Sequence, residues 1–275
     1  MPSQQKKINS PSSAIINQIL NLDISTYEKN LLLNTNKKLT PSIINKISKG
    51  FPVEYAVNKT IWYGVHFYVN SSVLIPRHET EQVVEIVNSQ VSPKEKYVFL
   101  DIGTGSGAII ITLAKTIKQN PDYCFIGSDI SPKAIKVSQT NKELHITPLN
   151  NNVSFYTGSL IHTQLKNLLL EKYKEYKLII IANLPYLSSQ DATVSSKVKK
   201  HEPHLALFAK NDGLYLYQKL FKQILRYKIP FHSIILEIDA EKANNFIKVC
   251  KQFFPNNKIS FTKDINLKNR FITIT

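Results

Sequence analysis

The sequence predicts an α/β fold with a mostly parallel, doubly wound sheet. From residue 97 onward, short apolar runs alternate with amphipathic stretches, an order typical of strands joined by crossover helices. Strands are predicted at Val98–Ile102, Cys124–Asp129, Val153–Tyr156, Leu178–Ala182, Ser233–Ile238, Ile259–Lys263 and Phe271–Ile274. Helices are predicted over 106–118, 132–143, 160–172, 213–227 and 240–252. Only Asn266–Asn269 joins the last two strands, which is too short for a crossover helix, so we expect that pair to be antiparallel.

A small helical domain is predicted before the sheet. Residues 1–13 are polar and are expected to form a loose tail. Over residues 14–50, apolar side chains recur at helical spacing, which predicts three short helices. Ser25 precedes the second of them, and Thr40 with Pro41 is a typical N-cap and first-turn pair for the third.

A linker and one further helix are predicted over residues 51–90. Alternating apolar residues around Trp62–Val69, followed by Val73–Ile75, favour a β-hairpin between the helical domain and the sheet. The helix is expected at about Glu79–Asn88. The rest of the chain, 91–275, is then the large α/β domain.

The composition indicates a folded protein and leaves its partner open. Of the 275 residues, 43% are hydrophobic, so a sizeable core can form. The net charge of +15 suits a nucleic-acid, ribosomal or acidic-protein partner, but the excess is scattered lysine, which a compositional bias explains equally well. Two isolated cysteines, Cys124 and Cys250, argue against a zinc site or disulfide framework and favour a reducing cytoplasm. No apolar run reaches transmembrane length, so no membrane partner is expected.

A glycine-rich turn follows the first predicted strand of the sheet. Gly103, Gly105 and Gly107 stand at alternate positions and lead into a predicted helix. Because glycine has no Cβ, the backbone can bend sharply there and lie against a ligand. Open α/β sheets bind ligands at this edge. The spacing differs from the Gly-x-Gly-x-x-Gly pattern of dinucleotide sites, which weakens that interpretation.

An acidic residue, Asp129, ends the next predicted strand. Its carboxylate can accept hydrogen bonds from both ribose hydroxyls of a nucleoside. Alternatively, it caps the helix that begins at Pro132, but the glycine loop one strand earlier favours the ribose role. A cofactor that has a ribose and no pyrophosphate to cradle points to S-adenosylmethionine.

The most informative stretch is Asn183-Leu184-Pro185-Tyr186, where the fourth predicted strand ends. An amide or exocyclic amino nitrogen is a weak nucleophile, because its lone pair is delocalised, and it must be held in line with the methyl group. The side-chain carbonyl of Asn183 and the backbone carbonyl of Leu184 can accept its two hydrogens. Tyr186 can lie flat on the planar group, and Pro185 stiffens the turn. Alone the stretch could be an ordinary turn, but after the glycine loop it favours methyl transfer to a planar nitrogen.

Two other charged stretches are expected to be structural. Residues 201–204, His-Glu-Pro-His, lack the His-Glu-x-x-His spacing, and Pro203 would disrupt a helix there, so no metal site is expected. Arg77 is close in sequence to Glu79 and Glu81 and could pair with either of them. If such a pair is exposed, it contributes little to stability.

Further motifs run from about Phe51 to the C-terminus. Residues 73–81 read Val-Leu-Ile-Pro-Arg-His-Glu-Thr-Glu, and residues 202–213 contain Glu-Pro, Ala-Leu and Asp-Gly pairs. Together with the glycine loop and the Asn183 motif, they resemble the N5-glutamine methyltransferases of the HemK/PrmC type. Members of that family modify the Gly-Gly-Gln glutamine of peptide-chain release factors.

This resemblance implies a Rossmann-like, seven-stranded methyltransferase sheet at 91–275, a hairpin linker and helix at 51–90, and a helical domain at 14–50 that docks the protein substrate. It implies S-adenosylmethionine as the cofactor and a release factor as the partner. The expected catalytic residues are Asn183, Leu184, Pro185 and Tyr186. The expected cofactor-binding residues are Gly103, Thr104, Gly105, Ser106, Gly107, Asp129, Leu160 and Asn183.

Several positions depart from the family pattern. Leu184 replaces a usual proline, so the turn is less rigid, and Asn-Leu-Pro-Tyr also resembles rRNA adenine dimethyltransferases. Ser159 stands where an aspartate is frequent, which puts an adenine contact there in doubt. Asn58 takes the place of a linker glycine, and His78 that of a frequent proline.

These departures keep other functions open. An RNA or DNA adenine N6-methyltransferase is favoured by the basic charge and by Leu184, whereas the segment 73–81 and the Glu202-Pro203 pair count against it. A catalytically silent binding protein on the same scaffold is favoured by Ser159. A glutamine on a ribosomal protein is a variant of the main hypothesis.

Overall fold

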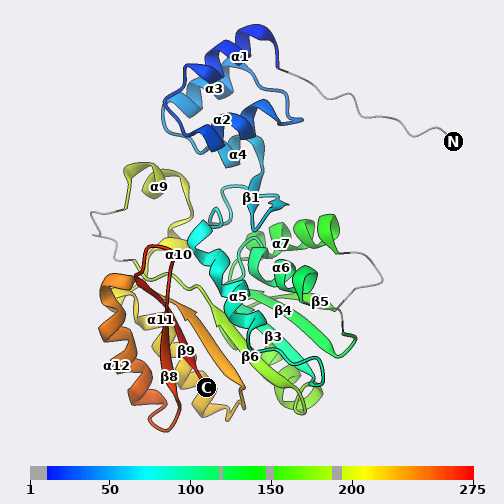
Figure 1. Cartoon of the computed structure of the whole chain (residues 1–275), viewed down its shortest axis with the longest axis vertical. Helices are drawn as coiled ribbons and strands as arrows, with labels where there is room; N and C mark the ends of the chain where they lie inside the picture. The colour runs from blue at the N-terminus through cyan, green and yellow to red at the C-terminus, as the bar shows by residue number, and fades with distance from the viewer. Residues whose placement is uncertain (1–10, 118–119, 147–151, 188–193) are drawn as a thin grey trace, which may run out of the picture.

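A computed structural model describes residues 11–117, 120–146, 152–187 and 194–275. Figure 1 shows a small group of helices at one end of the long axis and a large α/β domain at the other, with a two-stranded hairpin between them. The predicted α/β fold class is confirmed.

The large domain is built on a seven-stranded sheet with the order β5-β4-β3-β6-β7-β9-β8. Its strands are β3 (Tyr97–Ile102), β4 (Tyr123–Asp129), β5 (Val153–Thr157), β6 (Lys177–Ala182), β7 (Ser233–Glu237), β8 (Ile259–Lys263) and β9 (Asn269–Ile274). The pairs among β3 to β7 are parallel, whereas β9 is antiparallel to both β7 and β8. The antiparallel last pair, predicted from its short connection, is therefore confirmed.

The strand order reverses at β3. This strand lies between β4 and β6, and its last residue, Ile102, pairs with Ser128 on one side and Ala182 on the other. The carboxyl ends of the three strands therefore meet at one edge of the sheet. Such a reversal point opens a crevice that binds ligands in α/β proteins, and both motifs of the sequence follow directly from it.

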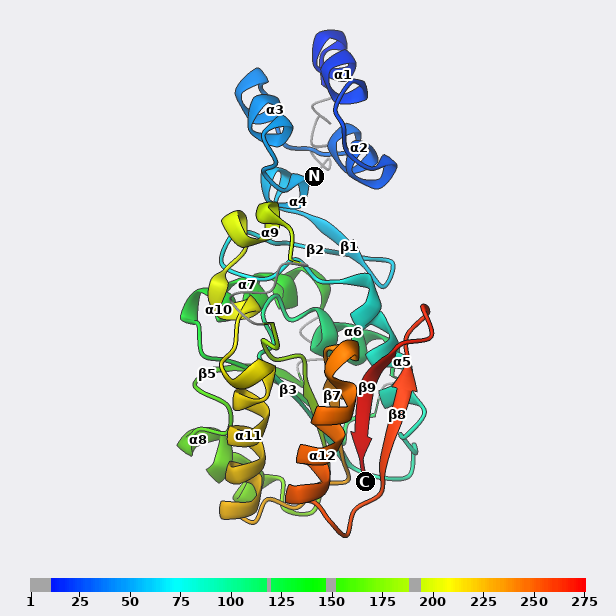
Figure 2. The same cartoon turned by 90° about the vertical axis from the view of Figure 1, so that its left-hand side faces the viewer.

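Helices cover both faces of the sheet (Figure 2). One face carries α5 (Gln82–Asn88), α6 (Ala108–Thr116) and α7 (Pro132–His145), and the other carries α8 (Thr163–Asn167), η3 (Leu168–Lys172), α11 (Tyr215–Arg226) and α12 (Ala243–Phe253). Shorter elements are η1 (His78–Glu81), α9 (Ser196–His201), α10 (His204–Leu207), η4 (Asn211–Gly213) and η5 (Ala240–Lys242). Neighbouring strand residues point to opposite faces, so Phe99 and Leu100 of β3 belong to different cores.

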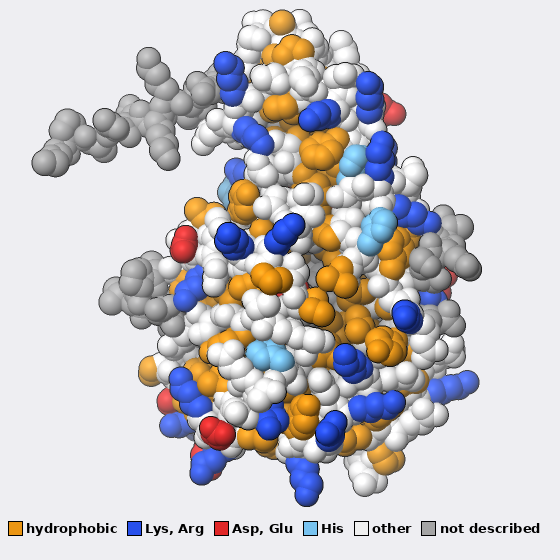
Figure 3. Space-filling model, turned by 180° about the vertical axis from the view of Figure 1, so that it is seen from behind, with side chains coloured by type: hydrophobic (Ala, Val, Ile, Leu, Met, Phe, Trp, Pro, Cys, Tyr) orange, Lys and Arg blue, Asp and Glu red, His pale blue; other side chains and the backbone are white. Residues whose placement is uncertain are grey.

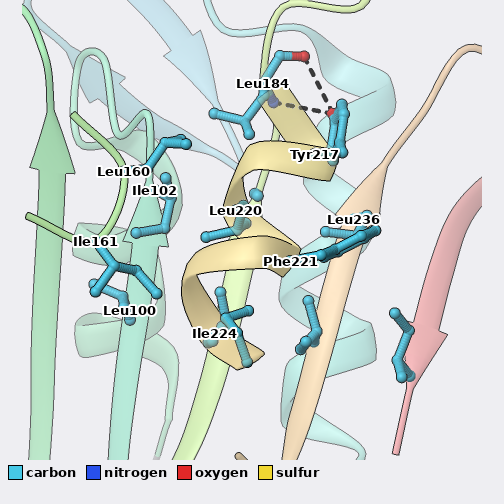
Figure 4. Packing of buried hydrophobic residues seen from close by; sticks show 14 of the residues in the cluster. Leu100, Ile102, Leu160, Ile161, Leu184, Tyr217, Leu220, Phe221, Ile224 and Leu236 are labelled. Carbon is cyan, nitrogen blue, oxygen red and sulfur yellow. Dashed lines mark hydrogen bonds between the residues drawn. The ribbon is translucent and has the colours of Figure 1, made fainter. Parts of the chain in front are cut away.

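The sequence of α11 has the apolar pattern of an amphipathic helix. Tyr217, Leu220, Phe221 and Ile224 recur at the spacing of one helix face, and all four are buried against the sheet (Figure 4). Burying a side chain of this size contributes about 1.5–3 kcal/mol relative to leaving it exposed. This packing fixes the start of α11 beneath the carboxyl ends of β6 and β7.

The helical domain consists of α1 (Ser13–Leu20), α2 (Thr26–Leu33), α3 (Pro41–Ser48) and α4 (Val53–Val57). Ser25 and Glu28 form a reciprocal capping box at the start of α2. Thr40 caps α3, and Pro41 occupies its first turn, as predicted. The short helix α4 was not predicted. Of the expected loose tail, residues 1–10 lie outside the described residues.

The predicted hairpin exists, but its strands were placed wrongly. The strands are β1 (Thr60–Trp62) and β2 (Val65–Phe67), and residues 73–75 belong to neither. Tyr63 and Gly64 have φ values of 49° and 67°. Two successive residues in this left-handed region form the tight turn that matches strand twist, so the hairpin closes at Gly64.

The linker is tied to the glycine loop by one buried asparagine. The Asn141 side chain accepts a hydrogen bond from the backbone N–H of Tyr68 at 2.7 Å and donates to the Tyr68 carbonyl at 2.9 Å. It also donates to the Ser106 carbonyl at 2.8 Å. The amide of Asn141 is fully buried, and these three bonds offset its desolvation. The linker therefore has a fixed position relative to the glycine loop.

Among the described residues, none of the helices combines the length and the hydrophobicity needed to span a bilayer. On the face seen in Figure 3, Lys and Arg side chains lie scattered among apolar and uncharged groups and do not gather into one stripe. That face shows the dispersed pattern expected of a compositional lysine excess.

Candidate active site

The glycine loop turns sharply at the end of β3. Gly103 and Gly105 have φ values of 79° and 53°, which favour glycine. The backbone N–H of Gly103 donates to the Ser128 carbonyl at 2.7 Å, which holds the turn against β4. The Thr104 hydroxyl donates to the Asp101 carboxylate at 2.6 Å. Burial raises the pKa of Asp101 to about 7, although the Thr104 hydrogen bond opposes this shift.

Asp129 reaches across from the end of β4. Its carboxylate accepts hydrogen bonds from the Gly105 N–H at 3.0 Å and from the Ser131 N–H at 2.8 Å. Burial raises its pKa, and these two bonds oppose that shift. The side chain of Ser131 caps α7, so Asp129 is not the capping group. An ionised carboxylate has about four acceptor sites, so two remain for hydroxyl donors.

An open cleft, with about 920 Å³ of empty space that includes open solvent, lies along these strand ends. Of the predicted cofactor residues, it is lined by Gly103, Gly105, Asp129, Leu160 and Asn183. A Cβ on Gly105 would meet no neighbour closer than 4.0 Å, so a side chain there would project into free space beside the loop. The cleft thus lies directly against the backbone of the glycine loop and beside the Asp129 carboxylate.

The other three predicted cofactor residues support the loop from behind. Thr104 and Ser106 are buried, and neither is among the lining residues of the cleft. A Cβ on Gly107 would lie 3.0–3.2 Å from Ile111, Ser138 and Phe155, so this glycine allows close packing of the helix that follows. These positions shape the loop through packing.

Asn183 follows directly after β6. Its side-chain NH₂ donates to the Glu237 carboxylate at 2.9 Å and to the Thr80 hydroxyl at 3.2 Å. Both amide hydrogens are therefore engaged, and the carbonyl oxygen keeps its acceptor capacity. Glu237 ends β7 and is 4% exposed.

Leu184 connects the two motifs. Its side chain is buried against the glycine loop, where a Cβ on Gly103 would lie 3.1 Å from Leu184 Cδ2. Its backbone N–H donates to the Tyr217 hydroxyl at 3.1 Å, and that hydroxyl lies 3.1 Å from the Leu184 carbonyl and 2.6 Å from the Glu237 carbonyl (Figure 4). A carbonyl has two lone pairs, so the Leu184 oxygen can accept a further hydrogen bond.

A second cavity meets the first at the Asn183 motif. The two share the lining residues Leu74, Asn183, Leu184, Pro185 and Ala206. The second is also lined by Tyr186, Arg77 and Glu237. Burial raises the pKa of Tyr186, so its hydroxyl stays neutral near pH 7. One cavity suits a nucleoside and its neighbour a second reactant, with Asn183 between them.

Arg77 forms a structural ion pair as expected, but the expected partner is wrong. The guanidinium pairs with Glu202 at 2.7 Å, not with Glu79 or Glu81. Glu202 is buried and also accepts a hydrogen bond from the Ile75 N–H at 3.2 Å. This contact fixes the linker to the segment after β6, so Glu202 is structural. Within the described residues, no three His, Cys, Asp or Glu side chains are placed to hold a metal ion.

Four residues of the site had no predicted role in it: Thr80, Glu237, Tyr217 and Gly213. Thr80 lies in the 73–81 segment that carried the resemblance, and Glu237 is the single charged residue in an apolar strand. Gly213 lies in the Asp-Gly pair of the 202–213 segment. These three signals were visible in the sequence, whereas the function of Tyr217 depends on contacts formed only in the fold.

Gly213 offers a test of the packing beneath the acceptor motif. It has a φ of +87°, and a Cβ there would lie 2.2 Å from the Tyr186 carbonyl oxygen. We expect Gly213→Ala to cost roughly 2–4 kcal/mol in the free energy of unfolding, because the backbone strain adds to a clash with main-chain atoms, and to lower kcat by displacing Tyr186. Urea unfolding and methylation kinetics measure both effects.

Gly64→Ala is the matched control. Gly64 also has a positive φ, +67°, but no atom lies within 4 Å of a Cβ there. This variant should lose only about 1–2 kcal/mol from backbone strain and should keep its kcat. Equal losses in the two variants, with kcat retained in both, would show that the Gly213 contact is unimportant.

Known proteins resemble this chain in sequence and in fold. Residues 93–256 match the family model described as a methyltransferase domain. The chain is 31% identical over 253 residues to the release factor glutamine methyltransferase of Streptococcus pneumoniae, covering 91% of this chain and 84% of that one. It is 35% identical over 229 residues to the protein of the same name from Bacillus subtilis, covering 82% and 75%.

Solved structures agree at the level of the fold. The N-terminal domain of human METTL16 in complex with SAH superimposes with a TM-score of 0.53 and 14% identity, covering 78% of this chain and 76% of that one. The hMettl16 catalytic domain in complex with a MAT2A 3'UTR hairpin gives 0.57 and 12%, covering 77% and 75%. The Rossmann-like methyltransferase fold is therefore confirmed.

Proposed function

Because this chain belongs to the release factor glutamine methyltransferase family, we propose that it methylates the side-chain amide nitrogen of a glutamine in a peptide-chain release factor. The chain is an S-adenosylmethionine-dependent methyltransferase. The acceptor would be the glutamine of a Gly-Gly-Gln motif, as the resemblance of the sequence implies. The position of Asn183 between two cavities carries the proposal.

The acceptor amide would be held by two carbonyls. A primary amide has two N–H hydrogens in one plane, and the Asn183 side-chain oxygen and the Leu184 backbone oxygen can accept one each. Tyr186 lines the second cavity, and its ring can cover the planar amide. Fixing a weak nucleophile in an attacking geometry can lower the barrier by about 7–11 kcal/mol in favourable cases.

The first cavity would hold the methyl donor. S-adenosylmethionine supplies an electrophilic methyl group on a sulfonium. The loop from Gly103 to Gly107 would approach it with its backbone, and Asp129 would accept hydrogen bonds from the ribose hydroxyls. Leu160 and Asn183 line the same cleft. Leu184 belongs to both cavities, so the donor and the acceptor would meet beside it.

The proposed function also indicates where the substrate docks and where the protein acts. The helical domain over 14–50 would dock the protein substrate, at the far end of the linker from the sheet (Figure 1). A nucleic-acid partner is less favoured and stays open. The two lone cysteines and a substrate that works in translation favour a cytoplasmic location.

Label transfer tests the proposal directly. The full chain is incubated with methyl-labelled S-adenosylmethionine and, separately, a release factor, ribosomal proteins and rRNA. We expect label on the release factor and none after its motif glutamine is replaced by glutamate. Label on rRNA alone would support an adenine methyltransferase instead, and label on a ribosomal protein would change the substrate but keep the amide chemistry.

A further inference from the structure

The side chain of Asn183 can take two orientations of nearly the same shape. Its carbonyl oxygen accepts hydrogen bonds and its NH₂ only donates them. If the oxygen faces the acceptor cavity, it can bind an N–H of the substrate amide. If the NH₂ faces that cavity, it opposes the same N–H and the substrate is repelled. The reaction therefore depends on what fixes the orientation of the Asn183 amide.

The carboxylate of Glu237 fixes the orientation of the Asn183 amide. An ionised carboxylate has only acceptor sites, so the group 2.9 Å from Glu237 Oε2 must be the NH₂ of Asn183. The Thr80 hydroxyl lies 3.2 Å from the same nitrogen and can accept its second hydrogen. The carboxylate therefore sets the orientation of the Asn183 amide, and Thr80 is compatible with it.

From this geometry we infer that Glu237 is a positioning residue for methyl transfer: its carboxylate holds the Asn183 NH₂ inward, so that the Asn183 carbonyl faces the acceptor amide. The inference rests on the proposed function and adds the residue on which the acceptor geometry depends. Glu237 acts through Asn183 and needs no contact with the reacting atoms. It must be ionised to do so, because a protonated carboxyl can donate to the Asn183 oxygen and permit the reversed amide.

The charge state of Glu237 is sensitive to pH. Burial raises its pKa to about 7. Hydrogen bonds from Thr80 and Tyr186 and the positive charge of Arg270 lower the pKa, while the negative charge of Glu79 raises it further. The ionised form is present above a pH of about 7 and is lost as the pH falls, so kcat should decline on the acid side of that value.

Glu237→Gln tests the role with little change in shape. A glutamine can present its own NH₂ to Asn183 and so allow the reversed amide. We expect kcat on a release factor to fall roughly 10- to 100-fold, which corresponds to about 1.4–2.7 kcal/mol in the activation barrier, because one substrate hydrogen bond is lost. The affinity for S-adenosylmethionine should be unchanged. The acid-side decline of kcat should also disappear, which a merely structural role would not produce.

Glu202→Gln is the matched control, because Glu202 is equally buried, at 4% exposure, and lies outside the Asn183 contacts. It should retain the acid-side decline. A neutron structure of the variant would show a reversed Asn183 amide, because X-ray data at ordinary resolution do not distinguish its oxygen from its nitrogen. If wild type methylates the glutamine but its kcat is flat between pH 6 and 8, or if Glu237→Gln matches wild type, this inference is wrong while the proposed function stands. If wild type methylates no glutamine, the proposed function itself fails.

Discussion

Asn183→Ala is expected to lower kcat by roughly 10²- to 10³-fold, the usual loss when one preorganised polar group that positions the reacting centre is removed. The side-chain carbonyl would no longer hold one N–H of the acceptor amide. The NH₂ that satisfies Glu237 and Thr80 would also be lost, which leaves a buried carboxylate short of a donor. Steady-state methylation of a release factor measures the effect.

Cofactor binding separates this result from misfolding. The glycine loop and Asp129, which would make the polar contacts to the cofactor, are intact in Asn183→Ala. Although Asn183 lines the same cleft, the affinity for S-adenosylmethionine, measured by calorimetry, should therefore fall much less than kcat. Asn245→Ala removes an exposed asparagine from α12 and should change neither quantity. Methylation by Asn183→Ala at the wild-type rate would refute the assigned role.

Asp129→Ala is expected to weaken S-adenosylmethionine binding by roughly 10²-fold or more. Two charge-assisted hydrogen bonds to ribose hydroxyls would be lost, each worth about 1.5–3 kcal/mol. The Gly105 N–H would also lose its acceptor, so the loop itself would be less ordered. Calorimetry measures the dissociation constant directly.

The control lies at the opposite end of the same strand. Asp122 precedes β4, its side chain is 46% exposed, and it pairs with Lys96 at 3.5 Å. Asp122→Ala should leave the dissociation constant unchanged, because an exposed pair contributes little and lies far from the carboxyl edge of the sheet. A wild-type affinity in Asp129→Ala would mean that another group holds the ribose.

Much of the fold was predictable because its signals are local. A buried strand such as β7 appears in sequence as a short apolar run. The start of α3 is indicated by Thr40, which caps the helix, and by Pro41 in its first turn. The turn at Gly64 was missed because its partner, Tyr63, is not a residue that favours a positive φ. The predicted helix over 160–172 begins later, at Thr163, because Leu160 takes a left-handed backbone conformation with a φ of 51°.

The site was predictable only where residues are adjacent in sequence. The glycine loop and the Asn183 motif each form one turn, so their residue types alone indicate their chemistry. The Arg77–Glu202 pair joins residues 125 positions apart, and no sequence rule favours it over nearby glutamates. The contact of Glu237 with Asn183 likewise depends on the pairing of β6 with β7.

A crystal structure of the chain with S-adenosylhomocysteine and a Gly-Gly-Gln peptide would examine the central claim most directly. We expect the glutamine amide nitrogen to lie about 2.7–3.2 Å from both the Asn183 side-chain oxygen and the Leu184 carbonyl oxygen, with the cofactor sulfur on the other side of that nitrogen. A complex in which Asn183 points away from the peptide, and the glutamine binds elsewhere, would contradict the account.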